Sequence, residues 1–201
     1  MAMADSLARA AVGPLLRGRF GRDVYLYVPR CASTQLVLDA DAPEGAVAVA
    51  DEQTHGRGRL GRTWTAPAGT SVLCSVQLRP SVEPPRLPEL SLVAGAAVAE
   101  AVAELTGLHP KLKFPNDVLI DGRKVAGILA EARDGRVVLG IGINVNQRAD
   151  ELPANTETPA TSLRLESGCE QPRVELLTLV LERLERRYDD WLSGRGAVRP
   201  A

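Results

Sequence analysis

The chain has 201 residues, which is enough for one domain with a substantial buried core. Hydrophobic residues make up 45% of the sequence but aromatic residues only 3%, so the core must consist mainly of Ala, Val and Leu. A formal net charge of -1 provides no general attraction to nucleic acid or to an anionic membrane.

The cysteine pattern and the hydropathy favour a reduced, cytoplasmic protein. Cys31, Cys74 and Cys169 lie far apart and lack the spacing of a zinc site or of a disulfide framework. The sequence has no recognisable signal peptide, and the apolar run from Ala94 to Ala103 is too short to cross a bilayer. We therefore expect neither secretion nor a membrane anchor.

The first half of the chain predicts one helix and several short strands. Residues Ser6 to Leu16 predict a helix that ends near Gly18, and Val24 to Val28 predict a strand that Pro29 stops. Residues Thr70 to Leu78 carry hydrophobic side chains at alternate positions, which is typical of a half-buried strand.

The second half predicts two long helices separated by hairpins. Residues Leu90 to Leu105 are apolar nearly all round and stop before Gly107, which predicts a buried helix. Asp121-Gly122 and Asp134-Gly135 each lie between β-prone runs, which predicts two tight hairpins. Residues Pro172 to Leu192 place their hydrophobic side chains on one stripe and predict an amphipathic helix.

One segment, Gly56 to Arg62, combines three glycines with three arginines. Glycines let backbone N–H groups approach an anion, and arginines supply permanently charged, forked donors. The segment is therefore either a loop that holds phosphate or carboxylate, or a flexible loop exposed to solvent. Its glycines also match the dinucleotide-binding fingerprint, but that fingerprint needs a helix to open within the motif. Because Arg62 to Gly69 is rich in turn residues, we exclude a dinucleotide fold.

Two pairs of polar residues allow a structural and a functional interpretation. Ser33 and Thr34 follow a predicted strand, where a hydroxyl either caps a helix or binds a polar ligand. A two-residue hairpin loop at Asp121-Gly122 makes Asp117 and Lys124 diagonal neighbours on one face of the sheet. They form either a surface ion pair of small energetic value or part of a functional site.

Two glycines interrupt the strand predicted from Val137 to Val145. Gly140 and Gly142 are two residues apart, so they share one face of that strand. Glycine inside a strand usually marks a bulge or a close approach to the backbone. Either a flat apolar ligand lies on this face, or the strand is bulged and a helix packs closely against it.

Together, five motifs resemble the catalytic domain of biotin protein ligases. In chain order they are Ser33-Thr34-Gln35; Gln53 with Gly56 to Arg62 and Trp64; Lys113 to Asp117; Lys124 to Leu129; and Gly140 to Asn144. Each motif alone is weak evidence for the family, but five motifs in the family's order and spacing are highly specific. The resemblance implies an α+β fold, with a mixed, largely antiparallel sheet flanked by helices, as in the catalytic core of class II aminoacyl-tRNA synthetases.

The resemblance also implies the domain organisation and the activity. Residues 1–201 would form a single biotin/lipoate ligase-type catalytic domain that lacks the small C-terminal β-domain of many family members. The implied activity is that of a biotin–[biotin carboxyl-carrier protein] ligase, which uses Mg-ATP to convert biotin into biotinyl-5′-AMP. The biotinyl group is then transferred to a lysine of biotin carboxyl carrier protein.

The resemblance assigns roles to individual residues. Biotin binding is implied for Ser33, Thr34, Gln35, Gln53, Gly56, Arg57, Lys124, Gly127, Leu129, Gly140 and Gly142, and nucleotide binding for Arg59, Arg62, Trp64, Asn116 and Asn144. Catalytic roles are implied for Arg57, Lys124 and Asp117, because two anions must meet at the reacting phosphate and the acceptor lysine must lose a proton. No residue is expected to bind a metal by itself, since Mg²⁺ enters with ATP.

The chain departs from the family pattern at three places. Phe114 stands where tryptophan is usual, and Gln35 where asparagine is common. The predicted loop from Gln147 to Thr161, which covers adenine in the family, contains no aromatic residue. About 30 residues precede the first motif, too few for a winged-helix domain, so we expect no DNA binding. The sequence is compatible with a homodimer.

Two other functions would also use features of this sequence. A lipoate or octanoate transferase would share the fold and the acyl-carrier chemistry, but the arginine-rich loop and Lys113 to Asp117 favour biotin. A nucleic-acid-binding module would use the Gly/Arg loop differently. The near-neutral charge and the lack of aromatic residues among the arginines argue against that module.

Overall fold

A computed structural model of the protein describes residues 5–154 and 156–195. Asn155, in the predicted Gln147 to Thr161 loop, and the two chain ends lie outside these residues. The strands are β1 (Tyr25–Cys31), β2 (Val47–Gln53), β3 (Gly56–Arg57), β4 (Thr63–Trp64), β5 (Ser71–Leu78), β6 (Lys111–Lys113), β7 (Asp117–Ile120), β8 (Arg123–Arg133) and β9 (Arg136–Asn144). The α-helices are α1 (Arg9–Val12), α2 (Leu90–Thr106), α3 (Leu163–Ser167) and α4 (Arg173–Leu192), and 3-10 turns lie at Gly13–Leu15, Thr34–Leu36, Arg59–Gly61, Pro84–Glu89 and Ala149–Glu151.

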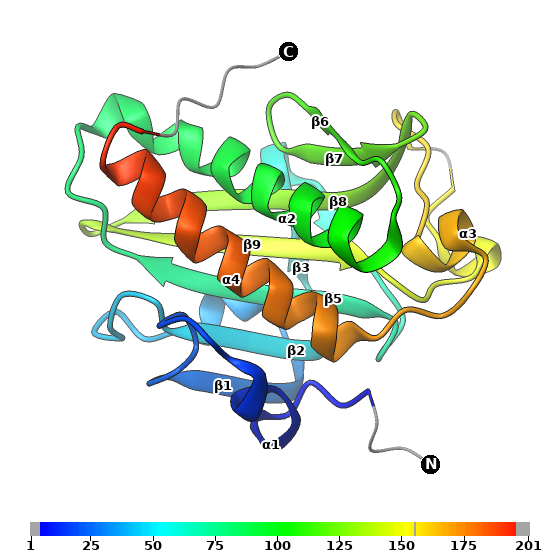
Figure 1. The fold of residues 1–201 in the computed structure, drawn as a ribbon, viewed down its shortest axis with the longest axis horizontal. Helices are drawn as coiled ribbons and strands as arrows, with labels where there is room; N and C mark the ends of the chain where they lie inside the picture. The colour runs from blue at the N-terminus through cyan, green and yellow to red at the C-terminus, as the bar shows by residue number, and fades with distance from the viewer. Residues whose placement is uncertain (1–4, 155, 196–201) are drawn as a thin grey trace.

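Within the described residues, seven strands form one sheet in the order β1-β2-β5-β9-β8-β7-β6 (Figure 1). Strands β1 and β2 are parallel, and the other neighbouring pairs are antiparallel. Helices α2 and α4 lie side by side across one face of this sheet (Figure 1). The predicted fold class, a mixed and largely antiparallel sheet flanked by helices, is confirmed. Strands β3 and β4 form a separate two-stranded ribbon.

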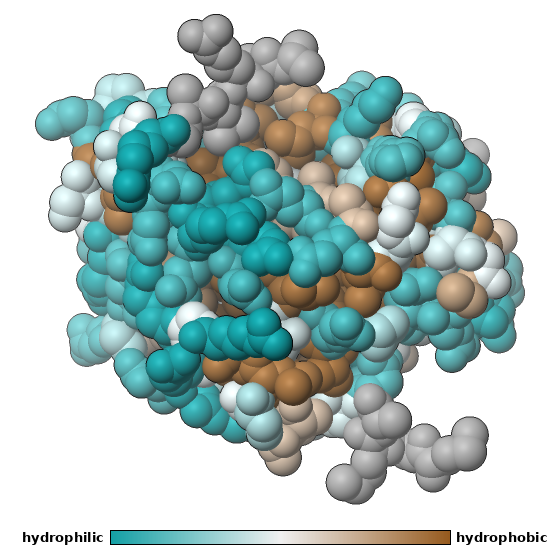
Figure 2. Space-filling model, viewed as in Figure 1, coloured by the Kyte–Doolittle hydropathy of each residue, from teal (hydrophilic) through white to brown (hydrophobic). Residues whose placement is uncertain are grey.

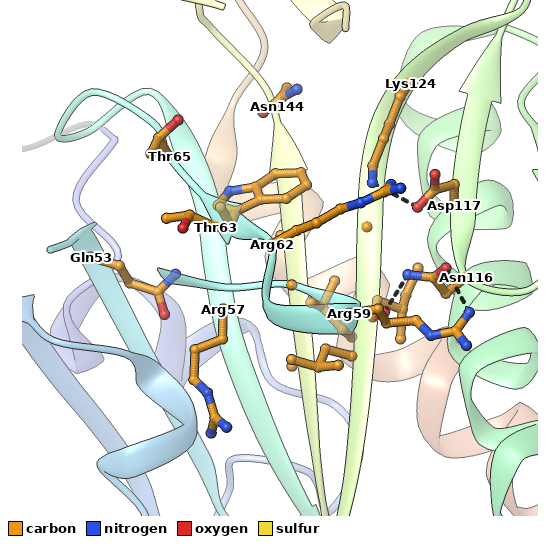
Figure 3. Close-up of a pocket in the computed structure, with 18 of the residues that line it drawn as sticks. Gln53, Arg57, Arg59, Arg62, Thr63, Thr65, Asn116, Asp117, Lys124 and Asn144 are labelled. Atoms are coloured by element: carbon orange, nitrogen blue, oxygen red, sulfur yellow. Dashed lines mark hydrogen bonds and ion pairs between the residues drawn. The ribbon is translucent and has the colours of Figure 1, made fainter. Parts of the chain in front are cut away.

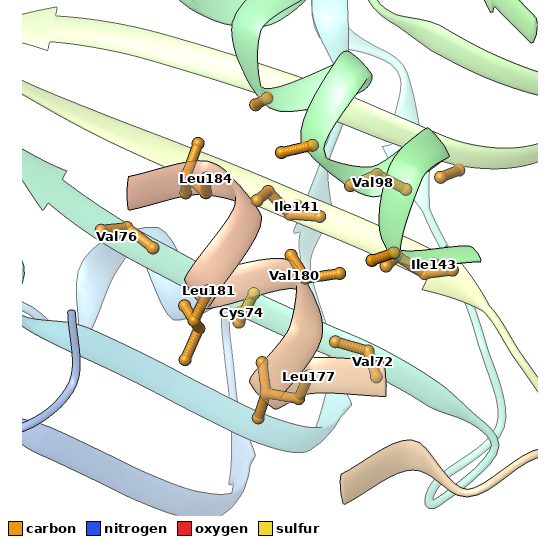
Figure 4. Packing of buried hydrophobic residues seen from close by; sticks show 14 of the residues in the cluster. Val72, Cys74, Val76, Val98, Ile141, Ile143, Leu177, Val180, Leu181 and Leu184 are labelled. Carbon is orange, nitrogen blue, oxygen red and sulfur yellow. The ribbon is translucent and has the colours of Figure 1, made fainter. Parts of the chain in front are cut away.

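The core lies between the sheet and the two long helices and consists mainly of Val, Ala, Leu and Ile. From α4, Leu177, Leu181 and Leu184 pack toward β5 and β9 (Figure 4). Helix α2 ends where predicted, because Gly107 has a φ of 71° and closes the helix in the left-handed conformation. No helix among the described residues combines the length and hydropathy needed to cross a bilayer.

Both Asp-Gly hairpins form as predicted. Asp121 and Gly122 have φ values of 48° and 77°, and Asp134 and Gly135 have values of 47° and 74°. Positive φ at both central positions is the requirement of a type I′ turn, whose twist matches that of the flanking strands.

Strand β5 differs from its prediction, because all eight of its residues are buried rather than alternate ones. Val72, Cys74, Val76 and Leu78 face the helices and belong to the main core. The opposite face of the strand is covered as well, since the Thr34–Leu36 turn packs there. A single sequence does not reveal that second cover.

Two further boundaries differ from prediction near the N-terminus. Strand β1 continues through Pro29 to Cys31, and Pro29 has no partner in the β1–β2 ladder. An edge strand pairs on one side only, so a residue without an N–H group is tolerated there. The predicted helix from Ser6 to Leu16 is limited to α1 and a 3-10 turn, because Pro14 has no N–H group to continue the α-helical hydrogen bonds.

A buried arginine joins α4 to the end of β2 that carries Gln53. Arg173 is 5% exposed and bonds to two carboxylates. It donates to Asp5 at 2.6 Å and to Asp51 at 2.9 Å. Burial alone would lower the pKa of Arg173, but hydrogen bonds to Asp5 and Asp51 raise it. The network therefore fixes the strand end from which Gln53 extends.

Charged side chains join the exposed sides of α2 and α4, where Figure 2 shows mostly hydrophilic residues. Glu100 of α2 accepts hydrogen bonds from Arg186 at 2.7 Å and from Arg187 of α4. Burial alone would raise the pKa of Glu100, but the two guanidinium groups lower it. Its stabilising effect is therefore present above the unfolded-state pKa and is lost as pH falls through the lower folded-state pKa.

We expect Glu100→Gln to lower the free energy of unfolding by about 0.5–1 kcal/mol at neutral pH. The difference from the wild-type protein should disappear in acid, where the wild-type carboxyl is protonated. Urea denaturation at pH 7 and at a series of lower pH values measures how the difference changes. A difference that stays constant throughout the series would show that charge is not the cause.

Candidate active site

A cavity of about 220 Å³ lies on the side of the sheet opposite α2 and α4. Its walls come from the sheet, the β3–β4 ribbon and the loop that follows β9 (Figure 3). The predicted site residues that line it are Ser33, Thr34, Gln35, Gln53, Arg57, Arg59, Arg62, Trp64, Asn116, Asp117, Lys124, Gly127, Leu129, Gly140, Gly142 and Asn144. Motifs from both halves of the sequence therefore meet around one space.

Gly56 and Phe114 do not line the cavity. A Cβ atom at Gly56 would lie 2.2 Å from the carbonyl oxygen of Trp64, so glycine is needed for the two strands of the ribbon to close. This role differs from the biotin contact predicted for Gly56. Phe114 is 69% exposed, so its ring packs little against the rest of the protein.

The floor of the cavity is made by glycines on the face of the sheet away from the helices. Gly142 lies directly opposite Gly127 in the β8–β9 ladder. The alternative of a bulged strand with a close helix is wrong, because β9 pairs without a register shift and Ile141 and Ile143 face the helices. Added Cβ atoms at Gly142 and Gly127 would lie 2.7 and 2.9 Å from the Trp64 ring. The glycines therefore allow an indole to lie against the sheet.

A β-bulge brings Lys124 to the same face as Gly127. The two residues are three positions apart, so a regular strand would place them on opposite faces. Between Asp117, which lies opposite Gly127, and the hairpin turn, the β7–β8 register shifts and Val125 has no partner. This extra residue turns the lysine toward the cavity, an effect typical of bulges near functional sites.

Lys124 contacts all three walls of the cavity. Its Nζ atom lies 2.7 Å from Oδ1 of Asp117, which confirms that the two residues share a face, and 5.6 Å from the centre of a ring of Trp64. The backbone of Lys124 accepts from the N–H of Thr161 at 2.8 Å and donates to the carbonyl of Pro159 at 2.7 Å. Lys124 thus fixes the loop after β9 and places an ammonium group inside the cavity (Figure 3).

The arginine predicted to act beside Lys124 instead pairs with a carboxylate of the protein. Arg57 lies 2.7 Å from Oε2 of Glu131, which also accepts from Arg133 at 2.6 Å. The Arg57 side chain extends away from Lys124 (Figure 3). In this arrangement, the guanidinium group ties the ribbon to β8.

The other two arginines of the loop lie at the cavity rim. Arg59 donates to Oδ1 of Asn116 at 3.4 Å, and Arg62 lies 3.1 Å from Glu157 of the loop after β9. These contacts are exposed and individually weak, so the guanidinium groups can exchange them for a ligand anion. The loop after β9 also lines the cavity through Pro153, Thr156, Glu157, Thr158 and Ala160, and the described part of it contains no aromatic residue.

At the other side of the cavity, the half-buried Gln53 forms a hydrogen-bonded cluster with two buried hydroxyl side chains. The Oε1 atom of Gln53 accepts from the backbone N–H of Thr34 at 2.7 Å and from its hydroxyl at 3.1 Å. The Thr34 hydroxyl also lies 2.8 Å from the hydroxyl of Ser75. Neither Ser33 nor Thr34 caps the turn with its side chain, so the capping interpretation is wrong. Ser75, which the sequence analysis missed, is a polar residue on a strand that is otherwise largely hydrophobic.

Two asparagines of the predicted nucleotide site hold neighbouring segments. Asn116 donates to the carbonyl of Ile128 at 2.9 Å, and Asn144 donates to the carbonyl of Thr161 at 3.0 Å. Cys74 lies in β5 beside the cavity, but its side chain packs in the core on the helix side, where burial raises the pKa of the thiol to about 12, so it is not a nucleophile at neutral pH. Across the described residues, no three His, Cys, Asp or Glu side chains gather in a metal-binding group.

Comparison with known proteins identifies relatives of this chain. The model of the biotin/lipoate A/B protein ligase family matches residues 27–147. The bifunctional ligase/repressor BirA of Bacillus subtilis is 40% identical over 158 residues, which cover 76% of this chain and 49% of that protein. The biotin–[acetyl-CoA-carboxylase] ligase of Mycobacterium tuberculosis is 43% identical over 174 residues, which cover 82% of this chain and 64% of that protein.

A solved structure shares the fold at substantial sequence identity. The biotin protein ligase of Aquifex aeolicus, in complex with biotin and ATP, superposes with a TM-score of 0.77 and 37% identity over 85% of this chain and 72% of that one. The chain spans about half the length of the Bacillus relative. On its sequence match and its fold, the chain belongs to the biotin/lipoate A/B protein ligase family.

Proposed function

We propose that this protein joins biotin to ATP and then transfers the biotinyl group to a lysine of a biotin carboxyl carrier protein. The observation that carries the proposal is the meeting of five separate sequence motifs around one cavity whose charged group, Lys124, lies above a glycine floor. The named relatives, which act on acetyl-CoA carboxylase or bind biotin and ATP, support the same substrates. The cytoplasmic location and the homodimer stay predictions.

The cavity has two chemically different sides that suit the two ends of biotin. The cluster of Gln53, Thr34 and Ser75 offers hydrogen bonds, which suit a ureido ring. Lys124 and Asp117 lie across the cavity from Gln53 (Figure 3), and the ammonium group suits the carboxylate. An apolar chain lying against the Trp64 indole, which covers Gly127 and Gly142, would join the two ends.

In the first step, a carboxylate oxygen of biotin attacks the α-phosphorus of Mg-ATP, and the bond to pyrophosphate breaks. Two anions must approach each other, so positive charge in a cavity with little water lowers the barrier. Lys124 provides that charge within the cavity, and Arg59 and Arg62 provide it at the rim. Holding both substrates in line contributes a further part of the rate.

In the second step, the amine of the acceptor lysine attacks the acyl carbon of the adenylate, and AMP leaves. A lysine amine is mostly protonated at neutral pH, so a proton acceptor is needed. Asp117 lies at the cavity wall, 18% exposed, and serves as that acceptor in this proposal.

Intact-mass measurement of a carrier domain tests the proposal. After incubation with the protein, biotin and Mg-ATP, the carrier should gain the mass of one biotinyl group. A carrier whose acceptor lysine is replaced by arginine should gain nothing. Modification with lipoate or octanoate, but not with biotin, would instead establish the rival transferase function.

A further inference from the structure

We infer that Glu166 of α3 is a positioning residue that holds Lys124 in place for the reaction from outside the cavity. This inference rests on the proposed function and adds a residue that none of the five sequence motifs contains. Glu166 acts through two neighbours. One is Arg123, which directly precedes Lys124, and the other is Thr161, which bonds to the Lys124 backbone.

Lys124 lies at a place where β8 has no strand neighbour on one side. The pairing of β8 with β9 begins at Ala126, so no residue of β9 pairs with Lys124. The loop after β9 takes that place, because Ala160 forms an isolated parallel bridge with Lys124. In this bridge the N–H of Lys124 donates to the carbonyl of Pro159, and the N–H of Thr161 donates to the carbonyl of Lys124. The backbone of Lys124 is therefore fixed on this side by a loop rather than by a strand.

The carboxylate of Glu166 joins the two segments that meet at this bridge. Its Oε1 atom accepts a hydrogen bond from the Thr161 hydroxyl, and its Oε2 atom lies 2.7 Å from the guanidinium group of Arg123. Hydrogen bonds to an ionised carboxylate are stronger than those between neutral groups. Only 5% of the Glu166 side chain is exposed, so water competes little for either contact. Glu166 thus resists separation of the loop from β8 at Lys124.

Helix α3 gives this carboxylate a fixed base. The N–H of Arg164 donates to the carbonyl of Val145 at 2.8 Å, and the hydroxyl of Ser162 donates to the carbonyl of Gln147 at 2.7 Å. The Ser162 hydroxyl also caps the helix by accepting from the N–H of Leu165 at 3.3 Å. The short helix is therefore tied to the residues that directly follow β9.

The position of the Lys124 ammonium group should affect the rate more than it affects biotin binding. In the proposed reaction this charge matters most when the two anions meet, and a displacement of about 1 Å can lower a rate by about 100-fold. The other end of biotin would still be held by the Gln53 cluster, which lies across the cavity from Lys124 (Figure 3). Loosening Lys124 therefore predicts a large loss of rate and a small loss of affinity.

The test is Glu166→Ala, assayed by biotin-dependent exchange of labelled pyrophosphate into ATP at saturating substrates and by calorimetry with biotin. We expect the exchange rate to fall about 10-fold and the dissociation constant for biotin to rise less than about threefold. Exchange at the wild-type rate, or a rate and an affinity that fall by the same factor, would overturn the inference.

Glu185→Ala is the matched control. Glu185 also bonds to an arginine, Arg19, and 17% of its side chain is exposed, but it belongs to α4 on the face of the sheet opposite the cavity. This variant should keep the wild-type exchange rate and biotin affinity. Losses equal to those of Glu166→Ala would show a general effect on stability and would refute the positioning role.

Thr161→Val decides the question if Glu166→Ala does not fold. It removes the hydroxyl that donates to Glu166 and keeps the backbone hydrogen bonds of the bridge. The exchange rate should fall about threefold, and an unchanged rate would show that the contact between Thr161 and Glu166 does not position Lys124.

Hydrogen exchange on the ligand-free protein tests the anchor without any substrate. The amide of Lys124 should exchange faster in Glu166→Ala and in Thr161→Val than in the wild type or in Glu185→Ala, because its acceptor belongs to the anchored loop. An unchanged amide would refute the anchor. A wild-type protein without biotin-dependent exchange would refute the proposed function, and the hydrogen-exchange result would still decide whether Glu166 holds Lys124.

Discussion

Replacing Lys124 with alanine is expected to lower the rate of adenylate formation by about 100- to 1,000-fold. The ammonium group lies inside the cavity, whereas Arg57 pairs with Glu131 and the other loop arginines lie at the rim. None of the described loop arginines places its charge where the Lys124 ammonium group lies. Alanine therefore removes the charge that offsets the two reacting anions. Biotin-dependent exchange of labelled pyrophosphate into ATP measures this step alone.

The variant must be separated from a loss of folding. Lys124 holds the loop after β9 through backbone hydrogen bonds, which alanine retains. The alanine substitution leaves Asp117 without its ion-pair partner. The double variant Lys124→Ala/Asp117→Asn should therefore recover stability without recovering the exchange rate. Lys113→Ala is the charge-matched control, because Lys113 bonds to Thr158 and does not line the cavity. Exchange at the wild-type rate in Lys124→Ala would remove this lysine from the mechanism.

The second large effect is expected at the glycine floor. In Gly142→Ala the new Cβ atom would lie 2.7 Å from Cε2 of Trp64, closer than carbon atoms can approach. The indole must move off the sheet and into the space where the ligand chain lies in our proposal. We expect the dissociation constant for biotin to rise about 10- to 100-fold, as measured by calorimetry.

Gly95→Ala provides a control with the same degree of crowding. Its Cβ atom would lie 2.7 Å from Cδ2 of Leu112, but in α2, on the opposite face of the sheet. The neighbour there is the end of a flexible side chain, and the cavity is distant, so biotin affinity should not change. If both variants bind biotin as the wild type does, the Trp64 indole on the glycine floor does not border the ligand.

The sequence predicted the turns and the helix end that depend on neighbouring residues in the chain. The Asp-Gly pairs formed type I′ turns because few other residues accept two successive positive φ values. The shared face of Asp117 and Lys124 followed from the length of one hairpin loop. Gly107 ended α2 for the same conformational reason.

Features that depend on distant contacts could not be predicted. The bulge at Val125 is a shift in the register between β7 and β8, and no residue type in the sequence indicates such a shift. The pairing of Arg57 with Glu131 joins residues far apart in the chain, so no local pattern could predict it. Ser75 escaped notice because a serine in a largely hydrophobic strand has no distinguishing spacing.

Pyrophosphate exchange into ATP, with no carrier protein present, decides whether this cavity joins biotin to a nucleotide. The wild-type protein should catalyse exchange when biotin is added and show only background exchange with lipoate or with no acid. Exchange that requires lipoate, or that is equally fast without any added acid, would show that the cavity does not activate biotin.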